Sequence, residues 1–168
     1  RLCRDKAKAL HQEIGQAATT RATIRKRLGA IIGADNVCFD PFSLISHATD
    51  ATDWRLHLPV AVARPAAESQ VAPLLAAIAD LGLKVIPRGG GTGLTGGAVP
   101  VSAGCVIINT EKLNRIHGIQ YRSFEDDHGT SHEMPVLKLD AGVITQEAMH
   151  FADKQGLVFA TDPTSAWA

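Results

Sequence analysis

The sequence has no excess of either charge and no long apolar run. Lys and Arg together number 17, and Asp and Glu together also number 17, so the formal net charge is zero. This balance argues against broad electrostatic binding to nucleic acid or to an anionic membrane surface. No apolar run reaches the roughly 20 residues that a bilayer-spanning helix needs, so we expect no such helix.

Cysteine is scarce, and a starting methionine is absent. The three cysteines, Cys3, Cys38 and Cys105, lie far apart and form no Cys-x-x-Cys motif. An odd number of scattered cysteines is typical of a reducing compartment rather than of a disulfide scaffold, so we predict a cytoplasmic protein. The chain begins with Arg1 and no signal-peptide apolar segment follows, which leads us to expect a fragment or a processed chain.

What is present suffices for a globular domain of mixed α and β structure. The chain has 168 residues, of which 45% are hydrophobic and 20% are charged. Apolar periodicity and turn residues predict helices over 4–33, 67–81 and 145–154, and strands over 60–63, 83–86, 105–108, 136–139 and 157–159. Val71, Leu74, Leu75 and Ile78 share the apolar face of the second helix. Its Pro73 fits only if the helix starts near Ala72, and Thr145 is the predicted N-cap of the third helix.

Two stretches, 34–58 and 117–135, lack a clear period and are predicted to be irregular. The first contains the turn signal Asp40-Pro41. The second is rich in charge and is predicted to be an exposed, mobile surface insertion over 120–134. A metal site is an alternative for either stretch; its donors would be Asp126, Asp127, His128, His132 and Glu133 in one, and His47, Asp50, Asp53 and His57 in the other. For the donors within 117–135 we favour a solvated loop, and for those within 34–58 we favour capping and turn roles. We predict no metal in either stretch.

Glycine is concentrated in one short stretch. Six of the nine residues over 89–97 are glycine, directly after a predicted strand. Glycine loses much conformational entropy on folding, so this density indicates a backbone that approaches a ligand closely or repeatedly adopts positive φ. Consecutive N–H groups in such a loop can form a concave anion site. Arg88 can add charge, and Thr92 and Thr95 can add hydroxyl donors.

Three phosphate-binding arrangements compete for this glycine loop. A P-loop ends in Gly-Lys-Ser/Thr, and no Lys lies between 85 and 111. Residues 91–96 match Gly-x-Gly-x-x-Gly, but that fingerprint needs a helix to begin here, and Pro100 with a β-rich run follows instead. The remaining arrangement, which the segment fits, is a strand–loop–strand turn that holds a pyrophosphate through backbone amides alone.

Residues 87–97, which read P-R-G-G-G-T-G-L-T-G-G, also carry a resemblance. The segment resembles the FAD-pyrophosphate loop of the vanillyl-alcohol oxidase and p-cresol methylhydroxylase type of FAD-linked oxidoreductases. The branch with D-lactate dehydrogenase and the glycolate oxidase flavoprotein subunit is the most similar. Residues 50–52, 140–143 and 156–165 resemble further stretches of the same domain, so the resemblance covers roughly 45–168.

The resemblance implies an α+β fold and FAD as the cofactor. The fold would be the FAD-binding domain of the p-cresol methylhydroxylase type, a mixed β-sheet flanked by helices, incomplete at the C-terminus. Residues 1–44 would form an N-terminal helical segment and loop, and 45–168 a partial FAD-binding domain. The residues implied to bind the cofactor are Arg88, Gly89, Gly90, Gly91, Thr92, Gly93, Gly97, Ala98, Pro163 and Thr164.

The parent protein is thereby expected to be an FAD-linked oxidase or dehydrogenase. Its small-molecule substrate would be a 2-hydroxy acid such as D-lactate or glycolate; the catalytic residues and the electron acceptor stay open. The isolated chain would bind FAD weakly and have no turnover, and an unpaired strand at 157–160 would favour self-association. The alternative is a non-catalytic module that binds another phosphate-containing ligand through the glycine loop.

Overall fold

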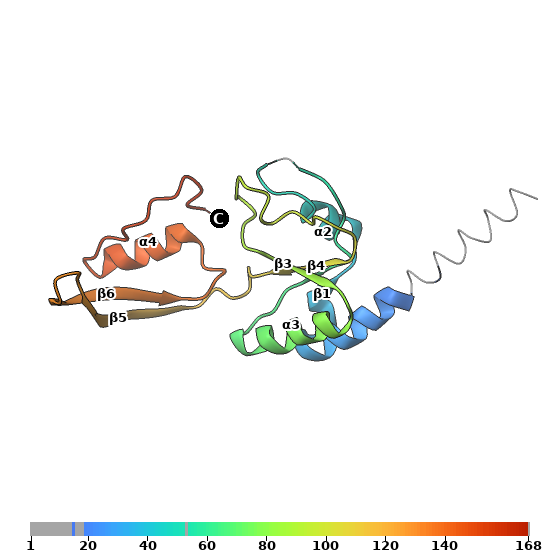
Figure 1. Cartoon of the computed structure of the whole chain (residues 1–168), viewed down its shortest axis with the longest axis horizontal. Coiled ribbons are helices and arrows are strands. Elements are labelled where there is room, and N and C mark those ends of the chain that lie inside the picture. Colours follow the sequence, from blue (N-terminus) through green and yellow to red (C-terminus); the bar gives the residue numbers. More distant parts are fainter. Residues whose placement is uncertain (1–14, 16–18, 53, 168) are drawn as a thin grey trace, which may run out of the picture.

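The computed structural model describes residues 15, 19–52 and 54–167, which form two groups of elements (Figure 1). One group is a four-stranded sheet with helices on both faces. The other is a two-stranded sheet covered by one helix, and the C-terminal end of the chain lies between the two groups (Figure 1). The predicted mixed sheet flanked by helices is confirmed.

The four-stranded sheet has the order β1-β2-β4-β3. Its strands are β1 (Val37–Cys38), β2 (Ala61–Ala63), β3 (Lys84–Arg88) and β4 (Cys105–Asn109). Strands β2, β4 and β3 run parallel, and β1 pairs antiparallel with β2. All five residues of β4 are buried, as expected for a parallel strand covered on both faces.

Alternate residues of these strands pack into two apolar clusters. On one face, Val106 and Ile108 pack with the helix over 19–32 and with α3 (Val71–Asp80). On the other face, Ile107 packs with Leu44 of α2 (Pro41–Ser46). The N-terminal segment therefore contributes to the same core as the sheet. The earlier part of the predicted first helix, 4–14 and 16–18, lies outside the described residues.

Helix α3 begins at Val71, after a short 3₁₀ turn, Glu68–Gln70. This start lies four residues after the predicted residue 67 and one residue before Ala72, the start that Pro73 indicated. Pro73 is its third residue, in the first turn, where a backbone N–H has no helical acceptor to lose. Leu74, Ala77 and Ile78 are its buried residues, whereas Leu75 is 40% exposed. The predicted apolar face was therefore wrong at Leu75, which Ala77 replaces.

The prediction of an irregular 34–58 was wrong at both β1 and α2. Asp40-Pro41 begins a helix instead of a turn. Asp40 is the N-cap of α2: its Oδ1 accepts from the Ser43 N–H at 2.9 Å, and Pro41 occupies the first helical position. The same residue pair suits both structures, and only the helix buries Leu44.

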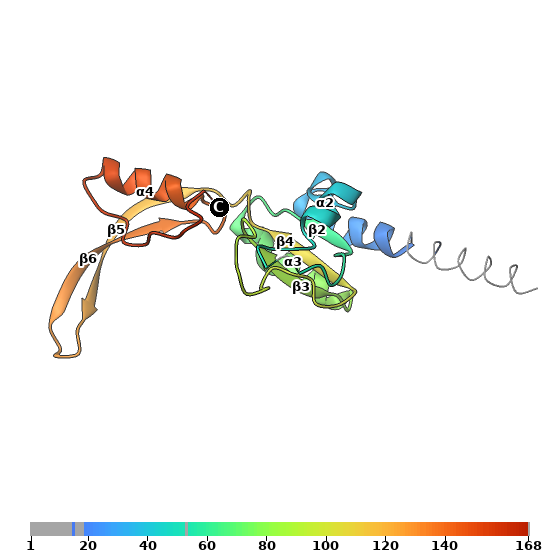
Figure 2. The same cartoon turned by 90° about the horizontal axis from the view of Figure 1, so that it is seen from above.

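The stretch over 117–135 was also wrongly predicted as irregular. It belongs to a long antiparallel hairpin of β5 (Ile116–Glu125) and β6 (Ser131–Leu139). At the turn, Asp126 Oδ1 accepts from the N–H groups of His128 and Thr130, both at 2.9 Å, and Gly129 has φ +78°. Figure 2 shows the hairpin tip extending beyond its covering helix. Residues 120–135 are all exposed, as predicted for 120–134.

Helix α4 (Thr145–Lys154) packs on β6 and ends as predicted, with Gly156 at φ +71°. Its N-cap is Ile144 rather than Thr145, which is the first helical residue. The predicted strand at 157–159 is wrong: those residues are irregular, and Val158 is 92% exposed because no neighbouring strand buries it. No helix in the described part of the chain has the length and apolar character needed to cross a bilayer.

Candidate functional site

The candidate site lies at the carboxyl ends of β3 and β4, which finish side by side with Arg88 opposite Asn109. Ligands of parallel sheets commonly bind at such an edge. A cleft of about 540 Å³ opens here. It is lined by Ser46, His47, the segment 88–90, the segment 109–111, the segment 141–145 and Trp167. Residues distant in sequence therefore meet at the start of the glycine loop.

The glycine loop leaves its backbone donors free. Among the described residues, no N–H group of 89–97 donates a hydrogen bond to another part of the chain. Most of the loop is exposed, and Gly91 and Gly96 have φ of +71° and +74°. Free amides beside a parallel-sheet edge fit an anion that carries several oxygen acceptors. The loop therefore fits the phosphate-binding arrangement inferred from the sequence.

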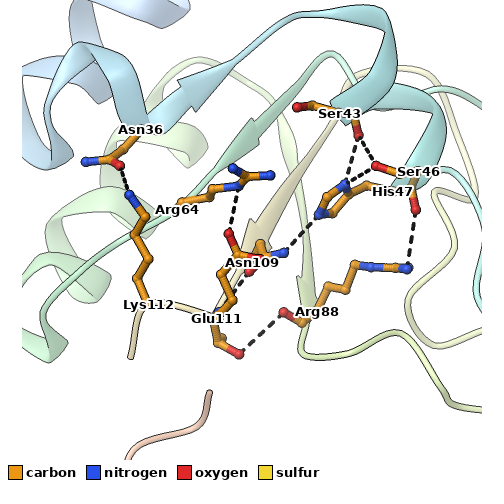
Figure 3. Close-up of polar contacts among 10 residues, drawn as sticks. Asn36, Ser43, Ser46, His47, Arg64, Arg88, Asn109, Glu111 and Lys112 are labelled. Carbon is orange, nitrogen blue, oxygen red and sulfur yellow. Dashed lines mark hydrogen bonds and ion pairs between the residues drawn. The ribbon is translucent and has the colours of Figure 1, made fainter. Parts of the chain in front are cut away.

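Arg88, the last residue of β3, turns its side chain away from β4. Its Nη1 donates to the Thr49 carbonyl oxygen at 2.5 Å, and its Nη2 donates to the Ser46 carbonyl oxygen at 3.4 Å (Figure 3). Burial lowers the pKa of Arg88, and the negative charge of Asp50 partly opposes that shift. The guanidinium is thus held by the carbonyl of Ser46, which is the last residue of α2, and by that of Thr49, which follows the helix.

A buried histidine forms part of the cleft lining. His47 is 7% exposed; its Nδ1 lies 2.8 Å from the Ser43 carbonyl oxygen, and its Nε2 lies 2.9 Å from Asn109 Nδ2. Asn109 Oδ1 accepts from the Glu111 N–H at 2.8 Å, which leaves the amide nitrogen to face the histidine (Figure 3). The ring is therefore neutral, with its proton on Nδ1. Burial, the largest cause, lowers the pKa of His47.

The remaining charged and close contacts fix the walls of the cleft. Arg64 Nε lies 3.2 Å from Glu111 Oε1, so the carboxylate of the lining is paired with a cation. The N–H of Gly142 donates to the Leu113 carbonyl oxygen at 2.7 Å. A Cβ at position 142 would overlap the Thr110 carbonyl, so only glycine allows these two turns to meet this closely.

The structure brings together only some of the predicted cofactor-binding residues. Arg88, Gly89 and Gly90 line the cleft. The other predicted residues, Gly91, Thr92, Gly93, Gly97, Ala98, Pro163 and Thr164, lie outside its lining. The cofactor-binding role of all ten residues stays a prediction. His47, Asn109, the 141–145 turn and Trp167 were not predicted. Asn109 could have been found as a polar residue that ends a buried strand; the others carry no local signal.

The two alternative metal sets have other roles where the structure describes them. His132 Nε2 lies 2.9 Å from Asp126 Oδ2 at the hairpin turn. Asp50 Oδ1 accepts from the Thr52 N–H at 2.9 Å, and His47 is the C-cap of α2, as expected for turn and capping residues. Asp53 lies outside the described residues. The described residues contain no group of three or more His, Cys, Asp or Glu side chains placed to hold a metal ion.

Comparisons with known proteins agree with this geometry. Residues 59–167 match the family described as "FAD binding domain". The chain is 29% identical over 163 residues to a mitochondrial protein of Schizosaccharomyces pombe named as a D-lactate dehydrogenase, covering 92% of this chain and 28% of that protein. It is 25% identical over 142 residues to the glycolate oxidase subunit GlcD of Bacillus subtilis, covering 84% of this chain and 28% of that protein.

A solved structure shares the fold. The crystal structure of p-cresol methylhydroxylase with substrate bound matches with a TM-score of 0.67 at 19% identity, over 89% of this chain and 28% of that one. At this identity the likeness concerns the fold alone. The chain spans 28% of the length of each of these three proteins.

Proposed function

Because this chain belongs to the FAD-binding domain family, we propose that its glycine loop holds the pyrophosphate of FAD and that the whole protein oxidises a 2-hydroxy acid. The substrate would resemble D-lactate or glycolate, since relatives of the chain are named for those activities. The electron acceptor stays open.

The free amides of the glycine loop carry the proposal. Residues 89–97 offer consecutive N–H groups without an acceptor in the described chain, and a pyrophosphate carries several oxygens that can accept from them. The amides of 89–93, Gly97 and Ala98 would bind the pyrophosphate, with Pro163 and Thr164 on the other side. Because this arrangement uses main-chain groups, it depends on the shape of the loop rather than on any one side chain.

The adjacent cleft would receive a neighbouring part of the cofactor. FAD, when bound, supplies the redox chemistry of such an enzyme, by accepting a hydride. His47, the one histidine of the described cleft lining, uses both ring nitrogens within the protein. It therefore shapes the cleft and does not exchange a proton with a substrate.

The test is a titration of the chain, labelled with ¹⁵N, with FAD and separately with inorganic pyrophosphate. We expect both to shift the amide signals of 89–98. We also expect an FAD affinity weaker than about micromolar, or −8 kcal/mol, because the chain spans only part of its relatives. Signals that shift only outside the loop, or none that shift, would contradict the proposal.

A substitution in the loop sharpens this test. Gly90→Val puts a β-branched side chain at the mouth of the cleft and should weaken FAD binding at least tenfold. The matched control is Gly82→Val, at a glycine with φ +68° and open space around it, which should lower stability and leave FAD affinity unchanged. Equal FAD affinity in Gly90→Val and the wild type would show that the cofactor does not approach this part of the loop.

The alternative is a non-catalytic module that binds another phosphate-containing ligand. Its loop amides would respond to pyrophosphate, while FAD would bind no more tightly than pyrophosphate alone. An FAD affinity that exceeds the pyrophosphate affinity favours a flavin site that extends into the cleft.

A further inference from the structure

We propose that a platform, residues 46–52 together with Trp54, gives the glycine loop its shape, and that Arg88 belongs to this platform as a positioning residue and does not bind the pyrophosphate. The proposal rests on the proposed function of the loop. It replaces the cofactor contact that the sequence predicts for Arg88 with a role in placing the amides that make the contact.

The first contact between platform and loop is Arg88 itself. Its guanidinium donates to the Ser46 carbonyl oxygen (Figure 3) and to the Thr49 carbonyl oxygen, so the cation is already engaged by the platform. A Cβ on Gly91 would overlap that guanidinium. The guanidinium therefore lies against the Gly91 backbone, between the loop and the platform. This packing explains why position 91 excludes a side chain, in addition to its φ of +71°.

Two further contacts lie later in the loop. The Trp54 ring lies so close to Gly96 that a Cβ there would be 3.0 Å from Trp54 Cε3 and 3.1 Å from Cζ3. The carboxyl of buried Asp50 accepts from the hydroxyl and the N–H of Thr52, and the Ala98 N–H lies near enough to help lower its pKa. These hydrogen bonds, with that of the Thr52 hydroxyl the largest, lower the pKa of Asp50 and keep it charged beside Arg88.

The three contacts fix the loop from one side. Positions 91 and 96 lie against the platform and the Ala98 N–H lies near Asp50, whereas the one backbone hydrogen bond found to the described loop runs from the Val99 N–H, just after it, to the Gly96 carbonyl oxygen at 3.1 Å. A glycine-rich segment loses much conformational entropy when it becomes ordered. Contacts that order the loop in advance reduce the entropy loss that ligand binding must offset. These contacts leave the amides of 89–97 free for the ligand.

A double-mutant cycle tests the contact at Gly91. Gly91→Ala should raise the unfolding equilibrium constant strongly relative to the wild type, through both the guanidinium and the positive φ. In the Arg88→Ala background the guanidinium is gone, so we expect the effect of Gly91→Ala on that constant to be at least tenfold smaller. The matched control is Arg64→Ala, which removes another arginine at this edge of the sheet that contacts Glu111 rather than the loop. There the effect of Gly91→Ala should be unchanged.

An equal effect of Gly91→Ala in all three backgrounds would overturn the role of Arg88. Should Arg88→Ala fail to fold, the cycle of Trp54→Ala with Gly96→Ala tests the same platform at a second point. Trp54 is 57% exposed, so its removal leaves the core intact. If the effects of Trp54→Ala and Gly96→Ala on the unfolding equilibrium are additive, the platform does not contact the end of the loop.

The salt dependence of FAD affinity separates positioning from direct contact. If Arg88 positions the loop, Arg88→Ala should weaken FAD binding at least tenfold, while the slope of log Kd against log salt concentration stays that of the wild type. A direct cation–pyrophosphate contact would instead make the slope shallower in the variant, because one ionic contact is lost. A merely structural role would leave FAD affinity unchanged in the folded variant. Either of these two results would overturn the proposal.

Backbone ¹⁵N relaxation without ligand keeps the two proposals distinguishable. The order parameters of the amides of 91–98 should be lower in Arg88→Ala than in Arg64→Ala, because the loop loses its contact with the platform. This result depends on the platform and not on FAD. If FAD fails to bind the wild type while the difference in order parameters is present, the proposed function fails and the platform stands. If FAD binds and the order parameters are equal, the platform fails.

Discussion

The four-stranded sheet and the β5–β6 hairpin differ in where their strands obtain stability. Strand β4 is buried along its whole length between helices, and its sequence is apolar from Cys105 to Ile108. The hairpin is longer, yet 120–135 is exposed on both strands, with Tyr121 63%, Phe124 47% and Met134 52% exposed. Its strands are joined by backbone pairing and by pairs such as Phe124 with His132.

This difference shows which strands can be predicted from their sequence. A strand buried on both faces requires apolar residues at successive positions. A strand paired on one edge and exposed on its faces accepts polar residues, since its stability comes from cross-strand pairs and main-chain hydrogen bonds. The charged hairpin therefore has the composition of a loop and the geometry of a sheet.

Truncation of one side chain in each region should give the largest contrast. Ile107→Ala in β4 removes a fully buried side chain that packs with Leu44, and should lower the free energy of unfolding by about 2–5 kcal/mol. Phe124→Ala removes a cross-strand partner in the hairpin and should cost less than about 1 kcal/mol. Chemical denaturation measures both. Comparable losses would mean that the hairpin is part of the core that stabilises the chain.

Glycine substitutions should give the next largest contrast. Gly142→Ala forces the turn after β6 away from the turn after β4, because a Cβ would overlap Thr110 and lie 2.9 Å from the Leu113 carbonyl oxygen; we expect about 1–3 kcal/mol of destabilisation. The matched variant, Gly129→Ala, lies at the hairpin turn in open space, with only its φ of +78° to disfavour it, and should cost about 1 kcal/mol.

The thermal midpoint of unfolding and the NMR signals of the cleft residues are the two measurements that compare Gly142→Ala with Gly129→Ala. Gly142→Ala should also displace the NMR signals of residues that line the cleft, whereas Gly129→Ala should affect the hairpin turn alone. Cleft signals that are the same in both variants would show that the two turns do not position each other.

The smallest contrast concerns pH. The folded pKa of His47 is lowered below its usual 6.5 by burial, so the unfolded chain binds the proton first. The contribution of the neutral His47 ring to the free energy of unfolding is complete above about pH 6.5. It is lost as the pH falls from there toward the folded pKa. In the hairpin, the hydrogen bond from His132 lowers the pKa of Asp126, so that contribution persists until pH falls below about 3.8. Mild acid should thus weaken the sheet before the hairpin turn.

Unfolding free energies between pH 7.5 and 5.5 check this order. His47→Gln should be less stable than the wild type at pH 7.5 and should show a weaker decline toward pH 5.5. An equally steep decline in the variant would assign the titration to another group.

The glycine loop and the buried strands were predictable because their residues carry local signals. Six glycines within 89–97, after a strand and before Pro100, by themselves indicate a loop whose amides can bind an anion. The continuous apolar run at 105–108 likewise indicated a buried strand. The start of α2 was less visible, because Asp40-Pro41 favours a turn and a helix start equally, and the burial of Leu44 decides between them.

By itself, then, the sequence determined the loop, the two strands that flank it and the family to which they belong, because each depends on residues that are adjacent in the chain. Tertiary structure decided the rest. It placed Arg88 against Gly91 and on the carbonyls of Ser46 and Thr49, paired His47 with Asn109, and brought 141–145 to the cleft. These contacts join residues more than thirty positions apart in most cases, and they arise from packing, for which a linear pattern carries no signal.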